Sequence, residues 1–436
     1  MQDQTSAFSL DRRRFLTTTA GVVGALAGMN LLQACGASGG SSGSNTLSFL
    51  GHETADQVKD LITGFEAAHQ GVSVQYQPVP FDQINDVLQT RLGSRDVTPD
   101  VYTADQPRMA ALHHRNFLAD ITGKVGSDKN AVLPASLQAS SLDGKIYSLP
   151  MATSTQLLYY NTALLEKAGV TPPETDQDKR WTWEQLVAAA QKAQAGGAKW
   201  GFIFEQVSRY YQLQSLFESA GAGSGLTGQG LLTPAITSPG WIKTATFYGQ
   251  LFSSGLAPKG VSPDQTTSLF TDGKVAFYLG GPWQLQPFSQ AKGLSFGVAP
   301  HPYFAGGKPV TPTSSWALAI NPNSQKQDLA YQFIQYATLT TKGSEQSNSS
   351  GGMPANIQAL DSYFAADYFQ KKNLIGAADL IKYEAQNTAV IRPPTIGYIQ
   401  FEDIMGAAFE DIRNGANVEQ RLQKASGDLK TAFARL

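Results

Sequence analysis

The sequence predicts an α/β fold built as two lobes, and three observations lead to this prediction. Residues 46–114 alternate short apolar strands with amphipathic helices, an order typical of a largely parallel sheet. Residues 144–161 contain two strand-like runs separated by small hydroxyl residues, which is typical of a passage between two domains. An ordinary β-hairpin within one domain fits this stretch equally well. The length of 436 residues allows two or three domains.

The composition narrows the functional class. The chain is 42% apolar and 16% charged, so it can bury large cores and is not disordered overall. Its formal net charge of −2 gives no basic excess for nucleic acid, and no nucleic-acid partner is expected. The sequence has no metal-ligand spacing, cysteine pair or G-x-S-x-G motif, so we expect no metal, no cofactor and no catalytic residue.

Residues 1–35 are predicted to be a targeting segment outside the fold. Residues 12–16 match the twin-arginine pattern R-R-x-F-L, and the mild apolar stretch after them is too short for a convincing membrane span. Residues 32–35 fit a lipobox ending at Cys35, the single cysteine, whose alternative role is a buried thiol. Residues 36–45 form a Gly/Ser tether. We therefore expect twin-arginine export and a lipid anchor that holds the protein at the membrane, facing the periplasm or cell exterior.

The first part of the mature chain predicts candidate ligand loops. Strands are expected at residues 46–51, 72–79 and 99–102, and helices at 57–68, 81–92 and 108–114. Ligands of such sheets bind beyond the carboxyl ends of the strands. This rule selects His52 and Glu53 after the first strand, and Asp105 and Gln106 after the third. Asp105 could instead serve as a helix N-cap, or do both.

The second part of the chain continues the alternation. Helices are expected at 181–194, 213–220, 241–253, 267–272, 327–338 and 401–434, and strands at 199–204, 274–278, 296–300 and 314–320. A loop at 209–211 precedes the second of these helices. The G-x-G-x-x-G spacing at 223–228 follows a helix rather than a strand, so it predicts a loop and not a dinucleotide site. The strand at 274–278 leads to Gly281 and Trp283 through glycines that permit close approach to a ligand.

Three motifs resemble one known family. They are G-K-x-Y-x-L-P at 144–150, W-T-W-E-x-L at 181–186, and F-x-x-G-K-V-A-F-Y-x-G-G-P-W at 270–283. These motifs resemble the extracellular solute-binding proteins of carbohydrate ABC transporters, family 1, which are maltose-binding-protein-like. The resemblance covers residues 46–436. It implies a two-lobed periplasmic-binding-protein-like fold, each lobe a mostly parallel sheet flanked by helices, joined by a multi-strand hinge.

The resemblance also implies the domain boundaries. The N-terminal lobe would consist of residues 46–152 and 311–350, and the C-terminal lobe of residues 153–310 and 351–436. The hinge crossings would lie near residues 153–155, 303–310 and 351–354. Ligand binding would close the lobes about these crossings.

The implied function is capture of a carbohydrate, a di- or oligosaccharide, in the interlobe cleft and its delivery to a membrane permease by a monomeric receptor. Trp283 would stack on the sugar, because sugar C–H faces pack well on a flat ring. A core tryptophan at a helix start is the alternative. The expected ligand-binding residues are His52, Glu53, Asp105, Gln106, Ser154, Thr155, Arg209, Tyr210, Tyr211, Gly281, Trp283, Ser315, Trp316, Arg392 and Tyr398.

One departure from the family pattern leaves other ligands open. The maltose-binding branch has a glutamate in the first crossing, where ungapped alignment gives Ser154 here. A glycerophosphodiester or glycerol-3-phosphate is one alternative, with Arg209 and Arg392 as phosphate partners. Ferric iron bound by adjacent tyrosines is another. A secreted carbohydrate-active enzyme is the alternative from a different class, since scattered carboxylates could pair as a glycosidase dyad.

Overall fold

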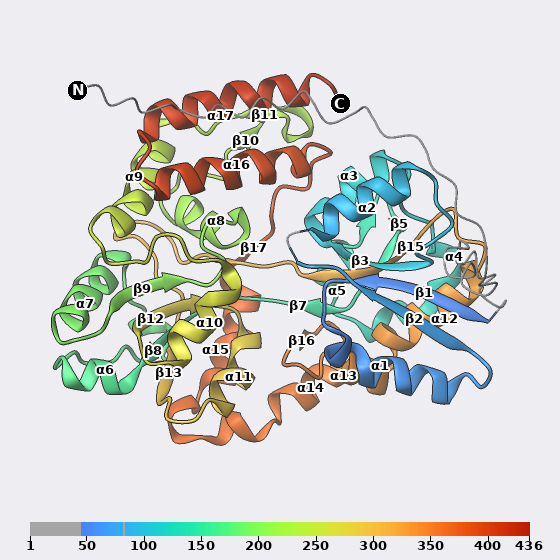
Figure 1. The fold of residues 1–436 in the computed structure, drawn as a ribbon, viewed down its shortest axis with the longest axis horizontal. Helices are drawn as coiled ribbons and strands as arrows, with labels where there is room; N and C mark the ends of the chain where they lie inside the picture. The colour runs from blue at the N-terminus through green and yellow to red at the C-terminus, as the bar shows by residue number, and fades with distance from the viewer. Residues whose placement is uncertain (1–44, 82) are drawn as a thin grey trace, which may run out of the picture. The chain divides into compact units, whose positions relative to one another are not determined.

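A computed structural model describes residues 45–81 and 83–436. The predicted signal segment, Cys35 and all of the predicted tether except its last residue lie outside the described residues. The described chain folds around two main sheets, one of five strands and one of four. Each sheet has hydrophobic clusters on both faces, so the predicted α/β fold of two lobes is confirmed (Figure 1).

The five-stranded sheet forms the N-terminal lobe, in the order β2-β1-β3-β15-β6. Its strands are β1 (Thr46–Gly51), β2 (Ser73–Pro78), β3 (Val101–Asp105), β6 (Ser148–Pro150) and β15 (Trp316–Ile320). Strands β1, β2 and β3 are parallel, and β15 is antiparallel to both of its neighbours. Four of the five strands, all except β15, therefore run in the same direction. The carboxyl ends of β1 and β3 lie at one edge, so the loops that follow these strands are close together.

Helices cover both faces of this sheet. The lobe's helices are α1 (Ala55–Ala68), α2 (Ile84–Gly93), α3 (Met109–His114), α4 (Thr122–Val125), α5 (Pro134–Gln138), α12 (Gln327–Leu339) and α13 (Thr341–Ser347), with a small β4–β5 ladder (Ser141–Leu142 and Lys145–Ile146). Helices α1 and α12 pack on the face that carries Leu47 and Phe49. Helices α2 and α3 pack on the opposite face, around Tyr102.

The four-stranded sheet forms the C-terminal lobe, in the order β13-β8-β12-β9. Its strands are β8 (Leu157–Asn161), β9 (Trp200–Phe204), β12 (Val275–Gly280) and β13 (Phe296–Ala299). Strand β8 is antiparallel to β12 and β13, whereas β9 and β12 are parallel. Leu158 belongs to one core and Tyr159 to the other. The second strand-like run of residues 144–161 is thus a strand, β8, that is buried on both faces.

The helices of the C-terminal lobe divide between the same two cores. They are α6 (Thr162–Lys167), α7 (Trp183–Ala195), α8 (Tyr210–Ser219), α9 (Pro239–Ser253), α10 (Pro263–Thr271), α11 (Leu285–Gln290), α15 (Ala377–Tyr383), α16 (Tyr398–Arg413) and α17 (Val418–Phe433), with a β10–β11 ladder (Leu226–Thr227 and Thr233–Pro234). Residues of α7, α8, α9, α16 and α17 share one core. Residues of α10, α11 and α15 pack in the other core. Trp183 is fully buried at the start of α7 and packs in the first of these cores.

The stretch 144–161 passes from one sheet to the other. Strand β6 pairs with β15 in the N-terminal lobe, and β8 pairs with β12 in the C-terminal lobe, so the stretch is not a hairpin. Between them, β7 (Ala152–Thr153) pairs with β16 (Met353–Pro354), which precedes α14 (Ile357–Phe364). Two of the expected crossings therefore lie side by side at the centre of the molecule (Figure 1).

The second crossing lies later in the chain than the expected residues 303–310. The backbone N–H of Trp183 donates to the carbonyl of Tyr303 at 2.8 Å, and Phe304 packs on the C-terminal core. These contacts hold the segment in the C-terminal lobe. The chain then forms β14 (Thr311–Pro312), which pairs with β17 (Ala389–Val390), and enters β15 through residues 313–315.

Two helix starts also differ from the predictions. Helix α8 begins at Tyr210, so only Arg209 of the predicted 209–211 loop lies outside it, as the N-cap residue. Helix α10 begins at Pro263, four residues earlier than predicted, because Ser262 and Gln265 form a reciprocal capping box. Proline at the first helical position supports the same start.

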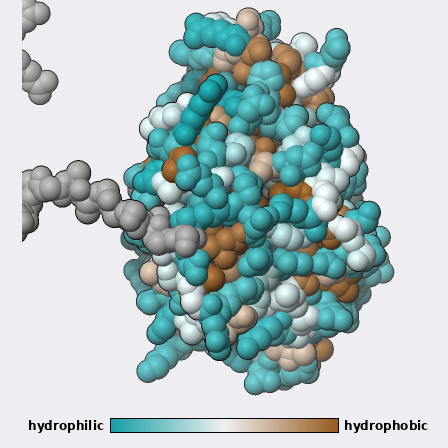
Figure 2. Space-filling view, turned by 90° about the vertical axis from the view of Figure 1, so that its right-hand side faces the viewer, coloured by the Kyte–Doolittle hydropathy of each residue, from teal (hydrophilic) through white to brown (hydrophobic). Residues whose placement is uncertain are grey.

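The surface of the N-terminal-lobe side is mainly hydrophilic, with hydrophobic residues in small separate groups (Figure 2). Among the described residues, the large hydrophobic side chains that are exposed are Val97, Ile357, Ile375 and Ile391. Within residues 45–81 and 83–436, none of the helices combines the length and the apolar character needed to span a bilayer.

Candidate ligand-binding site

A cavity of about 550 Å³ lies between the two lobes. Residues from the carboxyl ends of β1, β3, β9 and β12 contribute to its walls, together with the crossing segments. Ten of the residues predicted from the sequence line it: His52, Glu53, Asp105, Ser154, Arg209, Tyr211, Trp283, Ser315, Trp316 and Arg392. A cavity of this size is within the range that encloses small ligands.

An aromatic group forms the N-terminal-lobe wall. The rings of His52 and Trp316 are in contact at a tilt of 33°, with centroids 3.9 Å apart, and Phe81 meets both rings edge-on at 5.4 and 5.7 Å. Burial lowers the pKa of His52 below its ordinary value, with the positive charge of Arg209 adding to the effect and Glu53 opposing it. His52 is therefore a neutral ring at neutral pH. Phe81 was missed, since it follows β2 in a loop with no motif of its own.

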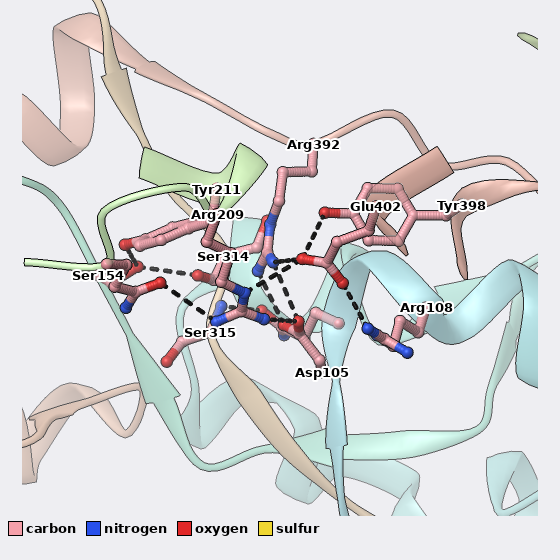
Figure 3. Close-up of polar contacts among 12 residues, drawn as sticks. Asp105, Arg108, Ser154, Arg209, Tyr211, Ser314, Ser315, Arg392, Tyr398 and Glu402 are labelled. Atoms are coloured by element: carbon pink, nitrogen blue, oxygen red, sulfur yellow. Dashed lines mark hydrogen bonds and ion pairs between the residues drawn. The ribbon is translucent and has the colours of Figure 1, made fainter. Parts of the chain in front are cut away.

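Asp105 ends β3 and lies between two arginines of the other lobe (Figure 3). Its carboxylate accepts two hydrogen bonds from Arg392, at 3.0 and 2.8 Å, and one from Arg209 at 2.7 Å. Asp105 occupies the N-cap position of the short helix η1 (Gln106–Arg108), but its side chain makes no capping bond. The alternative N-cap role is therefore wrong, because the arginines use the carboxylate.

A second carboxylate completes this ion-pair cluster. Glu402 on α16 accepts hydrogen bonds from Arg108 of the N-terminal lobe, from Arg209 at 3.1 Å and from Tyr398 at 3.3 Å. Burial alone would raise the pKa of Glu402, but Arg209, Arg108 and Arg392 together lower it to about 2. Three arginines thus face two carboxylates across the lobe boundary. Neither Arg108 nor Glu402 could be predicted from the sequence, because their partners are distant in the chain.

The C-terminal-lobe wall is built on Glu205 and Trp283. Glu205 follows β9 directly and accepts hydrogen bonds from the Trp283 indole N–H at 2.6 Å and the Gln284 amide at 2.6 Å. Trp283 is half-buried in η5 (Pro282–Gln284), which follows β12. Burial raises the pKa of Glu205 to about 6. Glu205 was missed, although the strand-end rule that selected His52 and Asp105 would have found it.

Hydroxyl groups line the floor near the crossings. The hydroxyl of Tyr211 donates to Ser154 Oγ at 2.9 Å, and Ser154 Oγ donates to the carbonyl of Ser314 at 2.8 Å (Figure 3). The guanidinium of Arg392 lies over the Tyr211 ring, 4.8 Å from its centroid. Ser154, Tyr211 and Ser314 all line the cavity. The first and second crossings are therefore joined by side-chain hydrogen bonds at the site itself.

Five of the predicted site residues lie behind the cavity wall. They are Gln106, Thr155, Tyr210, Gly281 and Tyr398. Gln106 accepts the backbone N–H of Ser315 at 2.9 Å and so supports a lining residue. Tyr210 is turned into the core by the early start of α8, and its hydroxyl donates to the carbonyl of Ser224. Gly281 accepts the Tyr159 hydroxyl on its carbonyl, and Tyr398 donates to Glu402.

The arrangement disfavours two of the alternatives. Arg209 and Arg392, the candidate phosphate partners, already donate to carboxylates at 2.7–3.1 Å. The hydroxyl of Tyr159, a candidate iron ligand, is buried on a backbone carbonyl. In the described part of the chain, no group of three or more His, Cys, Asp or Glu residues is placed to hold a metal ion.

Two α/β lobes that enclose an aromatic and polar cavity define a class: proteins that hold a small solute between two domains. The chain belongs to the bacterial extracellular solute-binding protein family, whose family model matches residues 51–343. It is 25% identical over 405 residues to a putative binding protein of Brucella abortus, which covers 90% of this chain and 93% of that protein.

Two further similarities are to a protein named for its ligand and to a structure solved with a ligand. The galactooligosaccharide-binding protein of Bacillus subtilis is 29% identical over 293 residues, 64% of this chain and 66% of that protein. An ABC substrate-binding protein of Listeria monocytogenes, solved in complex with cycloalternan, superposes with a TM-score of 0.78 at 20% identity. That alignment covers 89% of this chain and 99% of the solved chain. The structural likeness supports the two-lobed fold.

Proposed function

We propose that this protein is a receptor that captures an uncharged oligosaccharide between its lobes and delivers it to an ABC importer. The observation that carries the proposal is a pair of half-buried tryptophans in one cavity: Trp316 from the N-terminal lobe and Trp283 from the C-terminal lobe. Flat rings on opposite walls suit a chain of sugar rings, since aromatic faces pack well against C–H groups. The named ligands of the relatives agree with this chemistry.

The polar groups of the cavity match a ligand rich in hydroxyls. Among the described residues, His52 Nδ1 and Glu53 Oε2 are buried without a hydrogen-bond partner, and both residues line the cavity. Buried polar atoms of this kind are normally satisfied, so a bound hydroxyl group would lower the free energy of the site. The amides of Gln57, Gln206 and Asn348 add donors and acceptors around the wall.

The proposal is binding without catalysis. Three carboxylates line the cavity, and two of them, Asp105 and Glu205, are each held by two or more donors. Glu53 is left as the one cavity carboxylate with an unpartnered oxygen, and a single free carboxylate does not make an acid–base pair. A glycosidase needs two carboxylates that flank the scissile bond and exchange protons with it. Incubation with labelled oligosaccharides should return them intact, and any cleavage product would contradict this part of the proposal.

We also propose the location and the motion expected of such a receptor. The twin-arginine pattern and lipobox would export the chain and anchor it at Cys35, both outside the described residues. The ligand would bridge the lobes and stabilise a closed arrangement as a monomer. The permease would then accept the sugar from the closed receptor.

A thermal-shift screen tests the binding proposal. The panel comprises mono-, di- and trisaccharides, including galacto- and malto-oligosaccharides, with glycerol-3-phosphate and glycerophosphocholine as anionic and phosphodiester comparisons. A ligand that binds the native state raises the unfolding midpoint. We expect a shift with an uncharged oligosaccharide and none with the phosphate compounds. A shift confined to the phosphate compounds would reverse the choice of ligand class.

A further inference from the structure

Glu205 lies at the centre of the C-terminal-lobe wall. Its side chain is almost buried, with 6% of the residue exposed, and it lines the cavity at the end of β9. One oxygen, Oε1, accepts both the Trp283 indole N–H and the Gln284 amide at 2.6 Å. The other oxygen, Oε2, accepts the backbone N–H of Gly281 at 3.1 Å. All three donors belong to the segment that carries Trp283.

The carboxylate has no cationic partner among the described residues. None of the ion pairs in residues 45–81 and 83–436 includes Glu205, and the three hydrogen bonds hold its charge. The titratable groups that face it are Tyr159 on β8, Tyr211 on α8 and Tyr278 on β12. Burial raises the pKa of each tyrosine, so all three are neutral wherever Glu205 titrates. No salt bridge within the described residues therefore competes with Trp283 for the Glu205 carboxylate.

Two contacts with neighbouring residues orient the Trp283 ring in the wall. Its single polar atom, Nε1, donates to Glu205. Its six-membered ring lies directly over Gly281, where a β-carbon would come within 2.1–2.4 Å of three ring carbons. The glycine therefore provides room for the ring, and the carboxylate fixes its rotation.

We propose that Glu205 is the positioning residue for Trp283: it holds the indole ring as a preorganised face of the cleft. A ring already held in its binding orientation loses less entropy when a ligand packs on it. The effect on carbohydrate affinity rests on the proposed function, whereas the link between Glu205 and the ring does not. On protonation the carboxyl group loses its charge, and one oxygen becomes a hydroxyl donor among the three donors that face it. The hydrogen bonds that hold the ring would therefore weaken.

The first test needs no ligand. In ¹⁵N-indole NMR spectra, the Trp283 resonance is assigned as the signal missing from Trp283→Phe. We expect this resonance to move with pH between 5 and 7 in the parent, with a midpoint near pH 6, and to be displaced and insensitive to pH in Glu205→Gln. The control Glu66→Gln removes a half-buried carboxylate outside the cavity, which accepts a backbone N–H, and should keep the transition.

A Trp283 resonance that keeps its position and transition in Glu205→Gln would overturn the proposal. Should Glu205→Gln fail to fold, the parent decides over a wider range, because an indole signal that stays constant from pH 4 to 8 contradicts a hydrogen bond to a titrating carboxylate.

The second test measures coupling in sugar binding, with maltotriose as the probe. We expect Glu205→Gln and Trp283→Phe each to raise the dissociation constant at least tenfold. The double variant should lie within threefold of Trp283→Phe alone, because the positioning role disappears with the indole N–H. Fully additive losses would overturn the proposal, since Glu205 would then act on the sugar directly. Absence of maltotriose binding in all four proteins counts against the proposed function for this sugar, and the NMR test still decides the role of Glu205.

Discussion

Arg392 and Asp105 form a bidentate ion pair across the lobe boundary, with hydrogen bonds of 3.0 and 2.8 Å (Figure 3). The two residues are 287 positions apart in the chain. Both residues are almost completely buried. The pair lies in a cluster with Arg108, Arg209 and Glu402, so charged groups of both lobes depend on one another. Removing one charged residue from such a buried cluster leaves its partners with uncompensated charge, and this strongly destabilises the folded protein.

Asp105→Asn should therefore destabilise the protein and loosen the contact between the lobes. Three arginines would then face only Glu402, and we expect the unfolding free energy to fall by about 3 kcal/mol. Urea denaturation measures this loss, and small-angle scattering should show a larger radius of gyration without ligand. Asp120→Asn is the control, because its pair with Lys145 at 3.0 Å is solvent-exposed and should contribute less than about 1 kcal/mol. Equal effects of the two substitutions would contradict the role of the cluster.

Trp283→Ala should weaken oligosaccharide binding by about 2–4 kcal/mol, the range of a buried aromatic hot spot. The fold should persist, because Trp283 is half-buried in the cavity wall rather than in a lobe core. Trp283→Phe should recover part of the affinity, since a flat ring remains. Calorimetric titration gives the affinities, and Trp200→Phe is the control for Trp283→Phe, as a half-buried tryptophan of the same lobe outside the cavity. Binding of the parent's sugar by Trp283→Ala with unchanged affinity would place the site elsewhere.

Acid should destabilise the protein in part through Glu402. The folded pKa of about 2 lies below the ordinary value of 4.5, so the unfolded chain binds more protons between these limits. The contribution, roughly 3 kcal/mol, is complete above pH 4.5 and is lost as the pH falls toward 2. Unfolding free energies measured from pH 5 to 2.5 should fall more steeply for the parent than for Glu402→Gln. Parallel curves would show that Glu402 keeps an ordinary pKa.

Cys35→Ala should release the protein from membranes or block its maturation, because the lipobox would lose its acylated residue. Cell fractionation and immunoblotting measure the distribution. Substitution of lysine for both Arg12 and Arg13 should impair export instead, which separates the two roles of the amino-terminal segment. Membrane retention of the Cys35→Ala protein at the level of the parent would contradict lipid anchoring.

The strand pattern explains how much of the fold and site could be predicted. The alternation of strands and helices predicted the α/β lobes. The rule that ligands bind beyond the carboxyl ends of strands selected His52 and Asp105, which line the cavity. The same rule applies to Glu205 after β9, so that omission was avoidable. The capping box of Ser262 and Gln265 was also readable in the sequence. These local signals depend on short spacings, which the sequence displays directly.

Long-range electrostatics could not be predicted in this way. Glu402 is 294 residues from Arg108, and nothing near either residue indicates that they meet. Tyr210 and Tyr211 have the same side chain, yet a helix start between Arg209 and Tyr210 turns one into the core and the other toward the cleft. Such placements depend on packing between distant elements, and a single sequence carries no direct record of it.

The most direct test of the account is a crystal structure of the protein with the oligosaccharide that gives the largest thermal shift. We expect sugar density in the cavity between the lobes, with rings packed on both Trp283 and Trp316. A sugar bound to one lobe alone, or outside the cavity, would contradict the claim that the two lobes capture the ligand together.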